Sequence, residues 1–142
     1  MNENPSSRIR KDILFGLKLA GVMLVGALLL ALARKQGLID GELAVRANNV
    51  IMGLAMAAFG NVIPKMYGPP PRSLSQATLK QQVARVSSWA MTLGFLAWAA
   101  LWAFAPQEIA WVWSMAAVIA GMVVALGYTA WKCISHDRSS SD

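Results

Sequence analysis

The chain has 142 residues, of which 56% are hydrophobic and only 14% are charged. Soluble domains of this size are about a quarter charged, so the composition argues against a soluble globular protein. A net charge of +6 would suggest a nucleic-acid partner in a soluble protein. In a membrane protein the same excess arises from basic cytoplasmic loops, and nucleic-acid binding is therefore disfavoured.

Four stretches of the chain carry almost no charge. Residues 47–64, 86–107 and 109–131 contain no charged side chain, and residues 13–33 contain only Lys18. About 20 apolar residues are enough to cross the hydrocarbon core of a bilayer. The sequence therefore predicts an all-α polytopic membrane protein with four transmembrane helices in an antiparallel bundle. The expected helices cover about 13–33, 43–63, 87–105 and 109–131.

The segments outside the four expected helices of this transmembrane domain (13–133) are short and polar. Residues 1–12 are expected to form a cytoplasmic tail, and the Ser/Asp-rich residues 134–142 a disordered one. Residues 64–86 are expected to form a cytoplasmic loop. Three consecutive prolines in this loop favour an extended backbone. The mildly amphipathic end of this loop predicts a short interfacial helix before the third span.

The first span has a second interpretation. Ala31-Leu32-Ala33 resembles a signal-peptidase site behind a basic N-terminus. Arg34 and Lys35 would directly follow the cut, and the apolar run is long enough to span the membrane. An uncleaved helix is the prediction, while a mature chain that begins at Arg34 would leave three helices.

Basic residues predict the orientation. Of the 13 Lys and Arg residues, all except Arg34, Lys35 and Arg46 lie near the two termini or between the second and third spans. Basic residues are retained on the cytoplasmic side, so both termini are expected in the cytoplasm. The expected location is the bacterial inner membrane. The tryptophans predict interfacial belts at the two edges: Trp89 and Trp131 at the cytoplasmic edge, and Trp102, Trp111 and Trp113 at the other.

Small residues recur every four positions in the last two spans. Such spacing makes a smooth helix face that a second helix can approach closely. The partner could be a helix of the same chain, a second copy, or another membrane protein. The predicted packing residues are Ala90 and Gly94 in the third span, and Ala117, Gly121 and Ala125 in the fourth.

The chain carries no motif for a nucleophile, a nucleotide or a metal ion, and the sequence predicts a protein that is not an enzyme and has no cofactor. Proton-coupled transporters normally keep an ionisable group deep in the membrane. No acidic residue lies in the middle of any span, which argues against ion-coupled transport by this chain alone.

Polar residues gather at the two ends of the second span. Glu42 and Arg46 are one helical turn apart and can pair, and Asn48 and Asn49 follow them. Asn61 lies near the other end, where it is expected to bond backbone groups freed near Pro64 or a neighbouring helix. Structural glue within the bundle and a binding site are both open interpretations of these residues.

The segment Gly60-Asn61-Val62-Ile63-Pro64-Lys65 resembles the GNxxPK signature of the SdpI-type membrane proteins. In that family the next helix opens with an Arg and a Trp, and Arg85 and Trp89 stand in the corresponding places here. The resemblance covers about residues 49–101. The chain has Gly68-Pro69-Pro70-Pro71 where the family has a Gly-Ile-Arg-x-Pro-Trp stretch.

The resemblance implies a stand-alone membrane protein that binds a membrane-active peptide or small ligand, for immunity or signalling. The candidate binding residues are Arg46, Asn48, Asn49, Asn61, Pro64, Lys65 and Arg85. The alternative is an accessory subunit of a larger membrane complex, and a small transporter component is a third hypothesis. The expected partners are the lipid bilayer, a peptide ligand, and a membrane protein or second copy of the chain.

Overall fold

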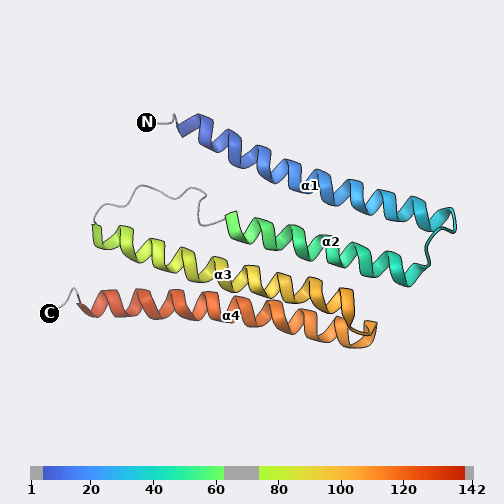
Figure 1. Ribbon diagram of the computed structural model, residues 1–142. Helices are drawn as coiled ribbons and strands as arrows, with labels where there is room; N and C mark the ends of the chain where they lie inside the picture. The colour runs from blue at the N-terminus through green and yellow to red at the C-terminus, as the bar shows by residue number, and fades with distance from the viewer. Residues whose placement is uncertain (1–4, 63–73, 140–142) are drawn as a thin grey trace.

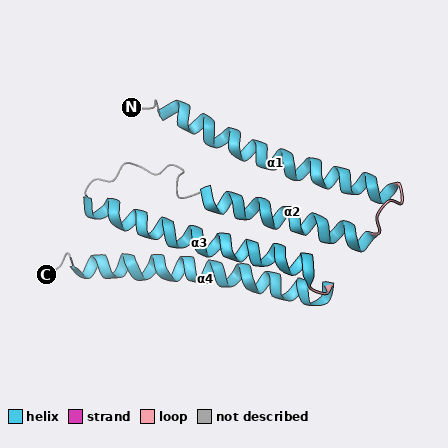
Figure 2. Cartoon of the chain, in the orientation of Figure 1, coloured by secondary structure: helices cyan, strands magenta, loops and turns pink. Residues whose placement is uncertain are grey.

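The computed structural model describes residues 5–62 and 74–139, which form four long helices (Figure 1). They are α1 (Pro5–Lys35), α2 (Gly41–Val62), α3 (Leu74–Phe104) and α4 (Gln107–Ser139). Each of the four contains a stretch long and apolar enough to cross a membrane. No strand occurs in the described ranges (Figure 2). The chain is an all-α, multi-pass membrane protein, and this prediction is confirmed.

Successive helices run antiparallel and pack in chain order (Figure 1). Among the described residues, the sizeable interfaces join α1 to α2, α2 to α3, and α3 to α4, and the last is the most extensive. The predicted antiparallel bundle is thus confirmed, with its helices arranged in series. An even number of crossings brings the two chain ends to the same end of the bundle (Figure 1).

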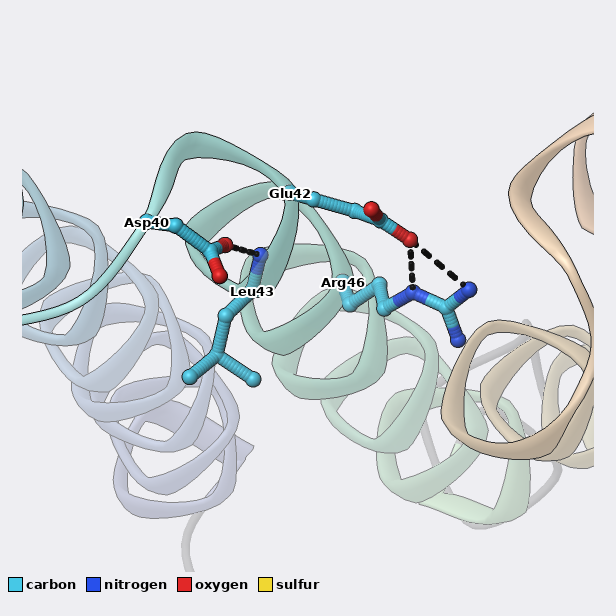
Figure 3. A network of polar contacts seen from close by, with 4 residues as sticks. All are labelled: Asp40, Glu42, Leu43 and Arg46. Atoms are coloured by element: carbon cyan, nitrogen blue, oxygen red, sulfur yellow. Dashed lines mark hydrogen bonds and ion pairs between the residues drawn. The ribbon is translucent and has the colours of Figure 1, made fainter.

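The turn between α1 and α2 is stabilised by two capping motifs, one at the end of α1 and one at the start of α2. Gly37 adopts a left-handed φ of 72°, which glycine tolerates best. The Leu38 amide then donates to the Ala33 carbonyl at 3.0 Å, so the last carbonyls of α1 are satisfied. Asp40 caps α2, because its Oδ1 accepts from the Leu43 amide at 2.7 Å (Figure 3). The polar cluster at the start of α2 is therefore fixed in place.

The turn between α3 and α4 is shorter and depends on Pro106. A proline has no amide hydrogen, so α3 ends two residues earlier at Phe104. The Pro106 carbonyl then accepts from the Ala110 amide at 2.9 Å and opens α4. This places the first residues of α4 beside the N-terminal turns of α2, at the end of the bundle opposite the chain termini.

Three helices extend beyond the predicted spans. α3 is a single helix of 31 residues, so the expected interfacial helix and the third span are continuous. No proline or glycine stands between Leu74 and Ala90 to interrupt it. α4 reaches Ser139 through the tail expected to be disordered, and α1 begins at Pro5, within the expected N-terminal tail. Residues 63–73, 1–4 and 140–142 lie outside the described ranges.

Apart from Trp102, which is 3% exposed, the core consists of small residues. Among the described residues, the buried positions include Ala55, Ala57, Ala99 and Ala110, the serines Ser88 and Ser114, and the glycines Gly53, Gly60, Gly94 and Gly121. Lipid tails are as apolar as leucine, so transmembrane helices associate through close backbone approach and hydrogen bonds. These small side chains therefore determine how tightly α2, α3 and α4 pack.

α1 stands apart from this core. It contains the most apolar stretch of the chain, with a mean hydropathy of 2.4, yet none of that stretch is buried inside the protein. Its face toward α2 includes Gly26, where an added Cβ would lie 3.3 Å from Ile51. Large apolar side chains elsewhere on α1, including Leu24 and Leu28, are exposed. They face lipid or another membrane-embedded partner.

Candidate functional site

A cleft of about 550 Å³ lies at the end of the bundle opposite the chain termini. It separates the first turns of α2 from the first turns of α4. We call it the polar cleft, and its lining residues are Glu42, Arg46, Pro106, Gln107, Glu108 and Trp111. Its volume falls in the range of roughly 300–1,000 Å³ that is usual for small-molecule sites.

A second cavity of about 310 Å³ adjoins the polar cleft between α2 and α3. Arg46 lines both cavities and is the charged residue of the second one. We call this cavity the apolar pocket, and its other lining residues are Leu43, Ala47, Val50, Ile51, Trp102 and Ala103. Both cavities are open grooves, so the two together offer a polar end and an apolar end to one ligand.

The guanidinium of Arg46 is oriented by Glu42. Its Nε donates to Glu42 Oε1 at 3.1 Å, and a terminal nitrogen lies 3.0 Å from the same oxygen (Figure 3). The two residues are one turn apart on α2, as the sequence predicted. The Arg46 side chain is 24% exposed and that of Glu42 is 59% exposed, so the pair contributes about 1 kcal/mol or less to stability. Its main effect is on where the guanidinium points.

The two asparagines after Arg46 have different environments. Asn49 is half-buried, and its Nδ2 donates to the carbonyl of Val45 at 2.9 Å on its own helix. Asn48 has an exposed side chain. Residues two apart on a helix lie about 200° apart around its axis, so Asn48 points away from Arg46. Of the three candidate binding residues at this end of α2 (Arg46, Asn48 and Asn49), only Arg46 lines the cleft.

The other predicted residues of α2 lie at its far end. Asn61 is 15 positions after Arg46, roughly 22 Å along the axis at about 1.5 Å per residue. Its side chain is exposed, as is that of Arg85 on α3. The structure therefore does not bring Asn61 and Arg85 to the polar cleft. Pro64 and Lys65 lie outside the described residues.

Ser88, and not Asn61, donates to a carbonyl that lies four residues before Pro64. The Gly60 carbonyl would normally accept from the amide of residue 64, but that residue is a proline. Ser88 Oγ on α3 donates to it instead at 2.6 Å, and both residues are buried. One turn away, Thr92 Oγ1 lies 3.5 Å from the Ala57 carbonyl. These contacts attach the end of α2 to α3.

The small residues of α3 and α4 face each other within the chain. A Cβ added at Gly121 would lie 2.8 Å from the Ala90 carbonyl oxygen, and one added at Gly94 would lie 3.1 Å from that of Ala117. This face is therefore occupied by the α3–α4 contact and is not available to another subunit. The Ala125 carbonyl accepts from Thr129 Oγ1 at 2.7 Å within α4.

Trp102 departs from its predicted position in an interfacial belt. It is only 3% exposed, and its Nε1 donates to Ser114 Oγ on α4 at 3.2 Å. A buried indole N–H needs such a partner. Trp111 and Trp113 are more than 60% exposed, as interfacial residues are.

Comparison of the chain with protein-family models, with curated proteins and with solved structures finds no match. The resemblance to the SdpI type therefore rests on the residues of the sequence.

The sequence did not single out Glu108 or Trp111 as members of a site. Glu108 marks the start of α4, where an acidic residue complements the helix dipole, and Trp111 fits an interfacial belt. Their proximity to Arg46 depends on the packing of α4 against the rest of the bundle. The available signal was the position of Glu108 as the one charge between two long uncharged runs.

Proposed function

We propose that the chain is a non-enzymatic inner-membrane protein of a bacterium, similar to the SdpI type. It binds a membrane-active peptide or another small ligand and thereby protects the cell or signals. The observation that carries this proposal is that Arg46 lines both the polar cleft and the apolar pocket. Ligand sites combine apolar walls with a few well-placed polar groups, and a membrane-active peptide offers both kinds of surface.

The distribution of charge supports a site that faces outward. Among the described residues, Arg34, Lys35 and Arg46 are the basic residues at the end of the bundle that holds the polar cleft, while the other described Lys and Arg residues lie toward the opposite end. Basic residues are retained in the cytoplasm. With both termini in the cytoplasm, the polar cleft meets a peptide that arrives from outside the cell.

α2 provides a physical route from this site to the cytoplasmic side. It carries Arg46 near one end, and Gly60, within the GNxxPK motif, near the other. The Ser88–Gly60 hydrogen bond of 2.6 Å attaches that second end to α3. A ligand that displaces α2 at the polar cleft acts on this contact, because a helix transmits movement along its axis as a rigid element.

Loss of Arg46 should abolish protection. Deleting the chain is expected to lower the concentration of membrane-active peptide that inhibits growth, and the wild-type chain to restore it. Arg46→Ala should leave cells as sensitive as the deletion, because it removes the cation shared by both cavities and leaves Glu42 unpaired. The measurement is the inhibitory concentration for a panel of such peptides, at matched amounts of membrane-inserted protein.

Asn48→Ala is the matched control, since Asn48 is an exposed residue two positions away that does not line the cleft. It should protect as well as the wild type. Unchanged sensitivity after deletion of the whole chain would contradict the proposal. Full protection by Arg46→Ala would show that the polar cleft is not the site through which the chain protects cells.

An accessory subunit of a larger membrane complex is the second candidate, and the exposure of α1 favours it. None of the most apolar stretch of α1 is buried within the chain, whereas the small-residue faces of α3 and α4 contact each other. A photo-crosslinking residue at Leu28 should then capture a stoichiometric membrane partner, and one at Leu126 on the exposed face of α4 should not. Equal capture from both positions, or from neither, would contradict a subunit contact through α1.

A further inference from the structure

We propose that the polar cleft and the apolar pocket form one site for an amphiphile with a cationic head group. This inference rests on the proposed function and names the chemical class of its ligand. The head group lies between Glu108 and Trp111, and the hydrocarbon segment lies along Val50 and Ile51.

The charge of the polar cleft favours a cation. Glu42 and Arg46 neutralise each other at 3.0–3.1 Å. Glu108 is exposed and has no hydrogen-bond or ion-pair partner within residues 5–62 and 74–139. The lining therefore has a formal charge of −1. Both α2 and α4 begin at this end, and each helix dipole is equivalent to about half a positive charge there. The Asp40 carboxylate that caps α2 opposes the dipole of that helix, so the Glu108 carboxylate is the group of the lining that a cation can pair with.

Trp111 provides a second attraction for the same head group. Its ring is 63% exposed and lines the cleft that contains Glu108. A cation over an indole face is attracted by the negative face of the ring, and quaternary ammonium groups are bound in this way. An anionic head would meet Glu108 with a charge of the same sign and gain nothing from the ring.

The apolar pocket accepts hydrocarbon because its polar groups are already satisfied. Trp102 lines the pocket, but its Nε1–H is committed to Ser114, so it presents only its ring. The Arg46 guanidinium is paired with Glu42, which lines the polar cleft and not the apolar pocket. The pocket volume of about 310 Å³ is at the lower end of the range for small-ligand sites, which suits a short chain rather than a whole lipid.

The test uses three probes with the same eight-carbon chain: octyltrimethylammonium, octyl glucoside and octyl sulfate. Binding to the full chain in phosphatidylcholine nanodiscs is measured by titration calorimetry, with empty nanodiscs subtracted. The cation should bind most tightly and the sulfate most weakly. Glu108→Gln should lower the affinity for octyltrimethylammonium about fivefold, which is the upper end of the range for an exposed ion pair. Asp12→Asn, at the other end of the bundle, makes the same change in net charge and should have no effect.

Glu108→Lys supplies a second variant, which should reverse the order so that octyl sulfate binds more tightly than the cation. Tightest binding of octyl sulfate to the wild type would overturn the inference, as would equal cation affinity in wild type and Glu108→Gln. If no probe binds while the chain still protects cells through Arg46, the inference fails and the proposed function stands. If the cation binds but deletion leaves cells unchanged, the proposed function fails instead.

Discussion

Gly121→Leu should separate α4 from α3 and destabilise the protein by about 3 kcal/mol, the upper part of the usual range for overpacking. Even a Cβ at this position would lie 2.8 Å from the Ala90 carbonyl oxygen. That oxygen belongs to the backbone of α3, so no rotamer change can move it away. The α3–α4 interface is the most extensive one among the described helices, and the helices must shift to admit the new side chain. The measurement is the midpoint of SDS-induced unfolding from mixed micelles.

Gly127→Leu is the matched control on the same helix. A Cβ at Gly127 would meet nothing within 4 Å, so leucine there faces open space and should leave the midpoint unchanged or slightly raised, since leucine is the better helix former. Equal destabilisation by the two substitutions would show that the Gly121–Ala90 contact does not hold the α3–α4 hairpin together.

Charge-free runs were sufficient to predict the four spans, because the length of a membrane-crossing helix is set by the bilayer. Helix ends were predicted less well. An end at Pro106 could be read from the sequence, since proline breaks the backbone hydrogen-bond pattern. The continuity of α3 from Leu74 was missed because the polar residues before Val86 were read as a separate interfacial segment. The passage from the headgroup region into the hydrocarbon core does not by itself end a helix. A helix-breaking residue such as proline or glycine is needed for that.

Only the α2 wall of the polar cleft was predicted from the sequence. Arg46 and its pairing with Glu42 follow from one-turn spacing on a single helix, which a sequence displays directly. The opposite wall, with Glu108 and Trp111, depends on how α4 packs near α2. The same limitation applies to Gly60. Pro64 indicated that backbone groups are freed near it, but the donor Ser88, 28 positions from Gly60, is selected by the register of α3 against α2.

Gly53→Leu should disable the site without altering any residue that lines it. A Cβ at Gly53 would lie 2.9 Å from Trp98 Cδ1, 3.0 Å from Ala99 Cβ and 3.1 Å from the Ala99 backbone nitrogen. Ala99 cannot yield by a rotamer change, because its Cβ and backbone nitrogen are fixed to the backbone of α3. α2 must therefore move away from α3. That displacement carries Arg46 away from Glu108 and Trp111, the opposite wall of the polar cleft.

Spin labels on Asn48→Cys and Ile109→Cys, both exposed positions, report the separation of α2 and α4 when Cys133 is replaced by serine. Gly53→Leu should lengthen this distance by roughly 2 Å, the spread that side-chain size produces between packed helices. The affinity for octyltrimethylammonium should fall about tenfold, or 1.4 kcal/mol. Gly16→Leu, where an added Cβ meets nothing within 4 Å, should change neither quantity. A longer distance with unchanged affinity would show that the two walls act independently. In that case the ligand would be held by α4 alone, because Glu108 and Trp111 would keep their relation to each other while Arg46 moved away.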